Sequence, residues 1–141
     1  MSNTEKLKKM MEQAAEVFKQ VDKVGEALRN NKMSKNIEFY SDNLDILTGC
    51  YSYIAPRYYR LAAEHTNGKL AKYMELKVEA VKEEVKFVNA PAEKEAEASV
   101  KENRVVRNLF EGYMKSSENA INTCKMQIKR IQGEDKADTN G

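Results

Sequence analysis

Hydrophobic residues recur at alternating intervals of three and four along most of this 141-residue chain. That spacing places them along one face of an α-helix, because seven residues make close to two helical turns. A first helix is predicted from about residue 4 to residue 30, and Ser2 and Glu5 have the spacing of a capping box at its start. Its apolar face consists of Leu7, Met11, Ala14, Phe18, Val21 and Leu28.

A second helix is predicted from about residue 34 to residue 66, with Ser34 as a favourable N-cap residue. Its apolar row runs from Ile37 to His65 without a change of phase, which predicts a partner helix along about 45 Å at 1.5 Å per residue. Pro56 lies within this row. Proline removes one backbone donor, but the row continues in phase beyond it, so we expect a kink and not a helix end.

The phase of the apolar row changes at Asn67-Gly68, which is typical of a helix end followed by a tight turn. The alternative is a local distortion within one longer helix. In the first case a third helix spans about residues 69 to 89, and Pro91 marks the next break because the residue before proline avoids the helical region. The apolar row of this helix is Ala71, Met74, Val78, Val81, Val85 and Val88.

The last helix is predicted from about residue 92 to residue 132, with Gly133 as its end and residues 133–141 as a disordered tail. Its apolar row contains three polar residues, and such residues can fix register and oligomer number. They are Asn103, Arg107 and Ser117. The chain is therefore predicted to be all-α: one domain over residues 1–132, with about four long heptad-patterned helices packed as an antiparallel bundle or coiled coil.

The charge content changes this picture in one respect. One third of the residues are charged, and 24 basic residues nearly balance 22 acidic ones to leave a net charge of +2. Such a composition favours long solvated helices with narrow apolar faces. Because helices of this length are too extended for a small monomeric core, we expect a homo-oligomer.

Catalytic residues are not evident in the sequence. His65 is the single histidine and lies on an apolar row, where a structural role is favoured. Carboxylates alternate with lysines at helical spacing, which is typical of a solvated helix face, and there is no glycine-rich phosphate loop. Cys50 and Cys124 match neither a disulfide framework nor a metal motif. We therefore predict a non-enzymatic protein without a metal or cofactor.

The location is predicted from two further features. The first thirty residues are charged throughout, unlike a signal peptide. No apolar run approaches the roughly 18 residues that a membrane span needs. We therefore expect no membrane association and a cytoplasmic protein.

Two arginines flank a tyrosine pair in the segment Arg57-Tyr58-Tyr59-Arg60. By the phase of the row, Tyr58 points inward while Tyr59 and Arg60 face outward. Outward aromatic side chains beside cations can stack on unpaired bases and hold phosphate. Tyrosine and arginine also dominate protein interfaces, so both interpretations stay open. Lys69 either extends this surface or belongs to a solvated helix face.

A second basic set lies near the end of the chain. Residues 121–132 contain Lys125, Lys129 and Arg130 and no acidic residue. Cations at a helix C-terminus are favoured by the helix dipole alone. Repeated around an oligomer, however, they would form a basic ring with salt-dependent affinity for phosphate.

The same region resembles the C-terminal signature of the UvsY family of phage recombination mediators. The resemblance lies in Ala120-Ile121, followed after six residues by Ile128-Lys129-Arg130-Ile131-Gln132. A looser similarity extends over much of the chain: a charged helical front, a turn near mid-chain, and a long final helix with aromatic residues before the signature. The family has extra basic residues after its Ala-Ile pair, whereas this chain has Asn122, Thr123 and Cys124.

Members of that family bind single-stranded DNA as oligomeric rings and help a RecA-like recombinase to displace single-strand-binding protein. The resemblance implies these three partners here: single-stranded DNA, a RecA-like recombinase and single-strand-binding protein. The expected DNA-binding residues are Lys125, Lys129, Arg130, Arg57, Tyr59, Arg60 and Lys69. The expected oligomer contacts are Phe110, Met114, Ile121, Ile128 and Ile131.

A second hypothesis belongs to a different class. The chain could be a non-enzymatic helical structural or adaptor protein of a phage, either a particle component or an inhibitor of a host protein. This hypothesis predicts no affinity for nucleic acid and a protein partner bound through tyrosines such as Tyr53 and Tyr59.

Overall fold

A computed structural model describes the backbone of residues 1–140 and the side chains of all of these except Asp135 and residues 137–140. This part of the chain forms four α-helices and no strand, which confirms the predicted all-α class. The helices are α1 (Asn3–Asn30), α2 (Ile37–Lys82), α3 (Asn89–Ser99) and α4 (Lys101–Asn140). Within the described residues no helix combines the length and apolarity that crossing a membrane requires.

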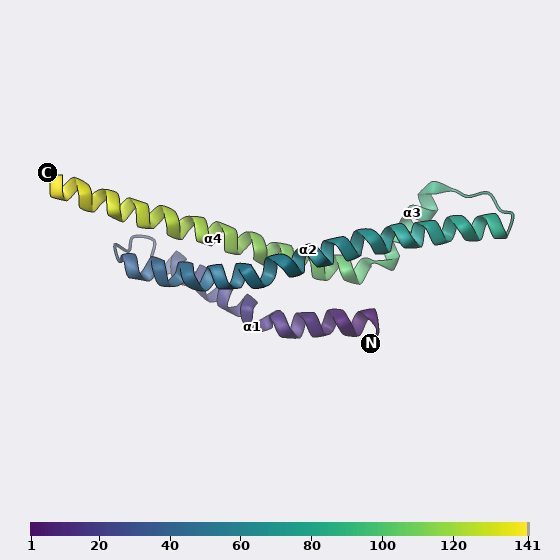
Figure 1. Ribbon diagram of the computed structural model, residues 1–141, viewed down its shortest axis with the longest axis horizontal. Coiled ribbons are helices and arrows are strands. Elements are labelled where there is room, and N and C mark those ends of the chain that lie inside the picture. The colour runs from purple at the N-terminus through teal and green to yellow at the C-terminus, as the bar shows by residue number, and fades with distance from the viewer. Residues whose placement is uncertain (141) are drawn as a thin grey trace.

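The helices form a long antiparallel arrangement (Figure 1). The chain runs along α1, turns back along α2, and returns through α3 and α4, so that α2 is antiparallel to α1 and α4. Helices α1 and α4 pack against the first part of α2, and α3 packs against its last part. We call α1, residues 37–65 and α4 the body, and residues 66–99 the arm.

The core of the body forms from the apolar rows that the sequence predicts, since an amphipathic helix gains stability by burying its apolar face. It consists of two clusters that both join α1, α2 and α4. The first contains Leu7, Ala14, Phe18, Val21, Cys50, Ile54, Ala55, Leu61, Val106, Phe110 and Met114. The second contains Val24, Tyr40, Leu47, Cys124 and Ile131.

The first helix starts as predicted, because Ser2 and Glu5 form a reciprocal capping box. The start of α2 differs from the prediction. Its N-cap is Asn36, whose side chain accepts a hydrogen bond from the amide of Phe39. The Ser34 hydroxyl instead accepts one from the amide of Asn36, so α2 begins at Ile37 and not near residue 34.

The predicted helix end at Asn67-Gly68 is wrong, because α2 continues through this pair to Lys82. The chain is therefore one longer helix over residues 37–82 and not two over 34–66 and 69–89. Gly68 does not form a turn; it allows another part of the chain to pack closely against α2. A Cβ atom at Gly68 would lie 3.0 Å from Cγ1 of Val100, so a larger residue would push on the junction between α3 and α4.

Pro56 lies inside α2 without ending it, as predicted, and α2 changes direction near its middle (Figure 1). The helix ends at Lys82, where Glu84 adopts a φ of 56° and the amide of Val85 donates to the carbonyl of Ala80. This is a left-handed helix termination built without glycine. Helix α3 then starts at Asn89, with Pro91 in its first turn, where a missing amide costs little.

The predicted last helix, residues 92–132, is divided in the structure. Val100 has a φ of −113° and separates α3 from α4. At the other end, Gly133 does not end α4, which continues to Asn140. The prediction of a disordered tail covers residues 133–141. Of these, the side chains of Asp135 and residues 137–140 and all of Gly141 lie outside the described part of the chain.

Candidate nucleic-acid interface

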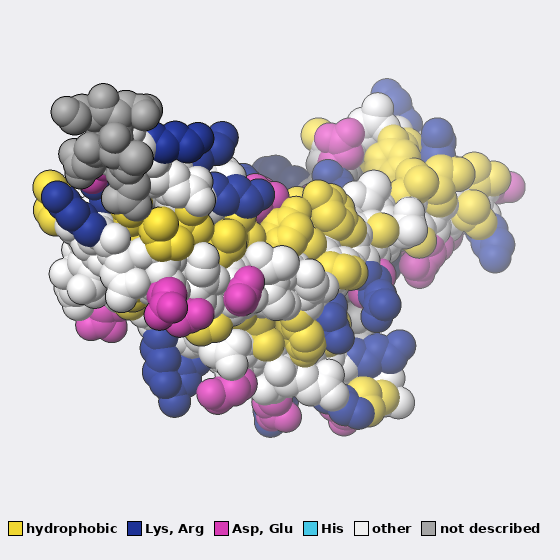
Figure 2. Space-filling model, turned by 60° about the vertical axis from the view of Figure 1, so that its left-hand side comes forward, with side chains coloured by type: hydrophobic (Ala, Val, Ile, Leu, Met, Phe, Trp, Pro, Cys, Tyr) yellow, Lys and Arg dark blue, Asp and Glu magenta, His cyan; other side chains and the backbone are white. Residues whose placement is uncertain are grey.

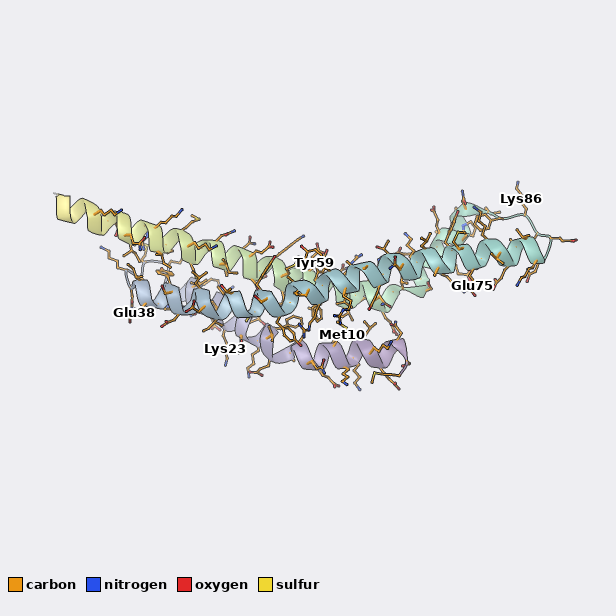
Figure 3. All side chains as sticks on the ribbon, in the orientation of Figure 1. Met10, Lys23, Glu38, Tyr59, Glu75 and Lys86 are labelled. Carbon is orange, nitrogen blue, oxygen red and sulfur yellow. The ribbon has the colours of Figure 1, made fainter. Side chains whose placement is uncertain are left out.

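The seven predicted DNA-binding residues do not form one cluster. Arg57, Tyr59 and Arg60 lie near the middle of α2, Lys69 lies where the arm meets the body, and the remaining three lie near the end of α4. Figure 3 shows Tyr59 beside the bend of α2, well separated from the end of α4. The predicted residues therefore belong to three separate parts of the surface.

The segment around Tyr59 has the orientation that its periodicity predicts. Tyr59 is 60% exposed and Arg60 is exposed, whereas Tyr58 packs partly against the core. Arg57 is less available than predicted. Its guanidinium lies 3.5 Å from the centre of the Tyr53 ring and donates a hydrogen bond to the Tyr53 carbonyl, so it covers that ring.

Lys69 pairs with a carboxylate of α3. Its Nζ lies 3.0 Å from Oε2 of Glu97, and the other Glu97 oxygen pairs with the guanidinium of Arg104. Hydrogen bonds from Lys69 and Arg104 lower the pKa of Glu97 to about 2. Lys69 therefore ties α2 to α3, and Glu97, which it shares with Arg104, compensates part of its charge.

Arg130 is also engaged in structural contacts. Its Nη2 donates to the carbonyl of Ser34 at 2.9 Å, and its Nε donates to the side chain of Gln127. Nη1 pairs with Glu134 at 3.0 Å. These bonds connect the loop after α1 to α4. Lys125 and Lys129 are exposed on α4 and have no ion pair within the described residues.

The five predicted oligomer contacts all lie in the core of a single chain. Phe110, Met114 and Ile131 are buried, and Ile121 and Ile128 pack against the second cluster. Phe110 meets Phe18 edge-on with ring centres 5.0 Å apart. The apolar row of α4 is thus covered by α1 and α2 of the same chain and leaves little for a second copy to contact.

Arg60 belongs to a groove that the sequence analysis did not anticipate. The groove has a volume of about 610 Å³ and lies between the start of α1, α2 near residues 60–68, and the α3–α4 junction. Its charged side chains are Lys6, Lys9, Arg60 and Glu64. Three cations thus face one carboxylate, and none of the three has an ion pair within the described residues.

Polar and flexible side chains complete the groove. Asn3, Gln13 and Asn103 supply amide groups, and the amide nitrogen of Asn3 donates to the side-chain oxygen of Asn103 at 2.8 Å. Met10 adds an apolar wall between α1 and α2 (Figure 3). The groove therefore offers cations for phosphate, amides for polar edges, and an apolar strip. We call it the basic groove.

Lys6 and Lys9 carry a weak signal in the sequence. They lie three residues apart, on adjacent turns of α1, in a segment rich in lysine. Periodicity shows that they are outside the apolar row, but the pairing of α1 with Arg60 of α2 is a tertiary fact. No spacing within either helix predicts it.

The junction of the arm and body holds the single histidine. Nη1 of Arg107 lies 3.2 Å from Nδ1 of His65, and because a guanidinium can donate only, Nδ1 is the acceptor. The proton of the neutral ring is then on Nε2, 3.6 Å from Oε1 of Glu97. Within the described residues no group of three or more potential metal ligands occurs. This cluster therefore connects helices, as a structural histidine does.

Cys50 and Cys124 are both buried free thiols, and burial raises the pKa of each. The Cys50 thiol faces the side-chain oxygen of Gln20 at 3.4 Å. A raised pKa disfavours the reactive thiolate, so neither cysteine has the environment of a nucleophile.

Comparison of the chain with protein-family models, with curated proteins and with solved structures gives no match.

Proposed function

We propose that this protein binds single-stranded DNA in the basic groove and acts, without enzymatic chemistry of its own, as a recombination mediator. In this role it helps to load a RecA-like recombinase on strands coated with single-strand-binding protein. The observation that carries the DNA-binding proposal is the charge of the groove, where Lys6, Lys9 and Arg60 oppose the single carboxylate of Glu64.

The physical basis is the affinity of clustered cations for phosphate. Each phosphate that a cation neutralises releases a condensed counterion, so binding is strong at low salt and weakens as salt rises. Tyr59 does not line the groove, but it is 60% exposed one residue before Arg60, where an open aromatic ring can stack on an unpaired base of a strand that extends beyond the groove. The resemblance of residues 120–132 to the signature of phage mediators is what favours the mediator role over simple DNA binding.

The DNA-binding proposal is tested by fluorescence anisotropy with a labelled oligothymidylate at salt concentrations from about 50 to about 300 mM. The variant Lys6→Ala/Lys9→Ala/Arg60→Ala is expected to bind more weakly at every salt concentration. Its plot of log affinity against log salt should be shallower by up to about 2, since each single-strand phosphate contact contributes about 0.7.

A matched control separates the groove from net charge. The variant Lys19→Ala/Lys32→Ala/Lys35→Ala removes the same number of charges from exposed positions outside the groove. It should keep most of the affinity and slope. Absence of binding by the native chain at low salt, or equal losses in both triple variants, would overturn the proposal. The mediator step is tested separately, by whether the protein accelerates assembly of a RecA-like recombinase on coated strands.

A helical adaptor protein is the second candidate, because the arm exposes apolar residues of the kind that protein interfaces bury. The same titration distinguishes the two candidates. An adaptor shows no affinity for the oligonucleotide even at the lowest salt concentration.

A further inference from the structure

The arm presents a row of exposed apolar side chains. Six of them, which we call the arm stripe, are between 48% and 75% exposed. The arm stripe consists of Leu70, Met74, Val78 and Val81 of α2 and of Val85 and Val88 in the segment between α2 and α3. Figure 2 shows hydrophobic side chains gathered on the arm where it extends away from the body. Contiguous apolar surface of this kind is uncommon on a soluble monomer and marks a contact surface.

Helix α3 does not cover the arm stripe, because it packs on the opposite face of α2. Tyr73 of α2 meets Phe87 edge-on and donates a hydrogen bond to the side chain of Asn89. Ala92 and Ala96 of α3 are buried on that side, and Gly68 approaches Val100. Helix α2 thus has two apolar faces in the arm, of which the chain itself covers one.

Charged residues flank the arm stripe in a self-complementary order. Glu75 follows Met74, and Lys82 follows Val81, so these two opposite charges lie on the same side of the stripe. Lys77 precedes Val78 on the other side. In an antiparallel pair of helices, equivalent sides face each other, and flanking charges determine the register and the choice of partner.

Two registers can be compared. If Val78 of one copy packs against Val81 of another, Glu75 of each copy lies beside Lys82 of the other, and Met74 meets the segment that contains Val85. If Met74 instead packs against Val78, Glu75 faces its own equivalent, and so does Lys77. The first register pairs opposite charges and the second pairs like charges, so charge selects the first.

We propose that the arm stripe is a homodimer interface, in which two copies of this chain pair antiparallel about a two-fold axis near residues 79–80. Each copy buries Met74, Val78 and Val81 against the other, with Glu75 beside Lys82 of the second copy. The two bodies then lie at opposite ends of a long dimer. The interface is small, so its affinity should be in the range of transient interfaces.

The dimer contacts lie beyond the basic groove on α2. Met74 is six residues beyond Gly68, the last α2 residue that lines the groove, which corresponds to about 9 Å at 1.5 Å per residue. The proposal therefore does not depend on the proposed DNA binding. Loss of one property without the other is a possible experimental result and would show which proposal has failed.

The test is sedimentation equilibrium of the full chain from about 1 to about 200 µM, a range that brackets the affinity of small interfaces. The native chain should pass from the mass of one chain to that of two. Val78→Glu should remain at one chain throughout while keeping its helical circular dichroism. A native mass of one chain across the whole range, or assemblies larger than two chains, would overturn the proposal.

A charge exchange tests the register. Glu75→Lys should weaken dimerisation at least about tenfold, because two copies each lose a favourable pair and gain like charges. Adding Lys82→Glu to it should restore dimerisation. Glu79→Lys is the control for the charge change, because Glu79 is exposed on the same helix but lies farther around it from the stripe than Glu75 does. Equal effects of Glu75→Lys and Glu79→Lys, or no restoration by the second change, would contradict the register.

Discussion

At the scale of single residues, the structure separates cations that are free to bind from cations that hold the fold together. Lys69 and Arg130 carry sequence signals for phosphate binding, yet one pairs with Glu97 and the other ties the Ser34 carbonyl to α4. Lys6 and Lys9 have weaker signals and face an open groove with Arg60. The availability of a charged side chain therefore depends on its neighbours in space more than on its neighbours in sequence.

The same distinction applies to the apolar residues of α4, and Phe110→Ala tests it. Phe110 is fully buried against Phe18, so the truncation should lower the free energy of unfolding by about 3–5 kcal/mol. Urea denaturation followed by circular dichroism measures the loss. Leu109→Ala, at a position 36% exposed, should cost less than about 1 kcal/mol. A Phe110→Ala variant of native stability that fails to self-associate would instead support an oligomer role.

At the scale of elements, α2 contains a glycine that makes room for the junction between α3 and α4. A Cβ at Gly68 would press on Val100, whereas a Cβ at Gly112 would meet nothing within 4 Å. The Gly112→Ala change should therefore raise the free energy of unfolding by about 0.5–1 kcal/mol, because alanine favours helix. Gly68→Ala should give no such gain. Chemical denaturation of both variants checks this, and an equal gain at Gly68 would mean that α3 and α4 do not approach it.

The junction of α2, α3 and α4 has its own pH dependence. Hydrogen bonds from Lys69 and Arg104 hold the pKa of Glu97 at about 2, below the ordinary value of 4.5. A depressed carboxylate pKa stabilises the fold above the ordinary value, and this contribution is lost as the pH falls from about 4.5 to about 2. Glu97→Gln should therefore melt below the native chain at pH 7, and the two melting temperatures should converge near pH 2. A constant difference across this range would contradict the role of the charged pair.

At the scale of the whole molecule, the body and the arm differ in how much apolar surface they bury. The body has two core clusters shared by three helices, whereas the arm is a pair of helices with one apolar face uncovered. Local stability follows buried contacts, so the arm should open more readily than the body.

Hydrogen exchange measures this difference. In dilute protein, amides of residues 70–82 should exchange faster than those of residues 50–54 and 110–114, which belong to the core. At concentrations where arms pair, residues 70–82 should gain protection while the body does not change. Uniform protection of the arm and body in dilute protein would show that the arm is as stable as the core.

The sequence by itself determined the helical class and the apolar rows of three segments: α1, the first part of α2, and α4. It also determined the capping box at Ser2 and the passage of α2 through Pro56. These features follow from local geometry, residue type and hydrophobic spacing. The sequence could not determine that α2 continues through Asn67-Gly68, because an Asn-Gly pair equally suits a helix end and because the neighbour of Gly68, Val100, is distant in sequence. Nor could it predict which apolar row stays uncovered or which cations share a groove. Those outcomes depend on how helices distant in sequence pair in space. The pattern within one helix does not specify which residues of another helix will lie next to it.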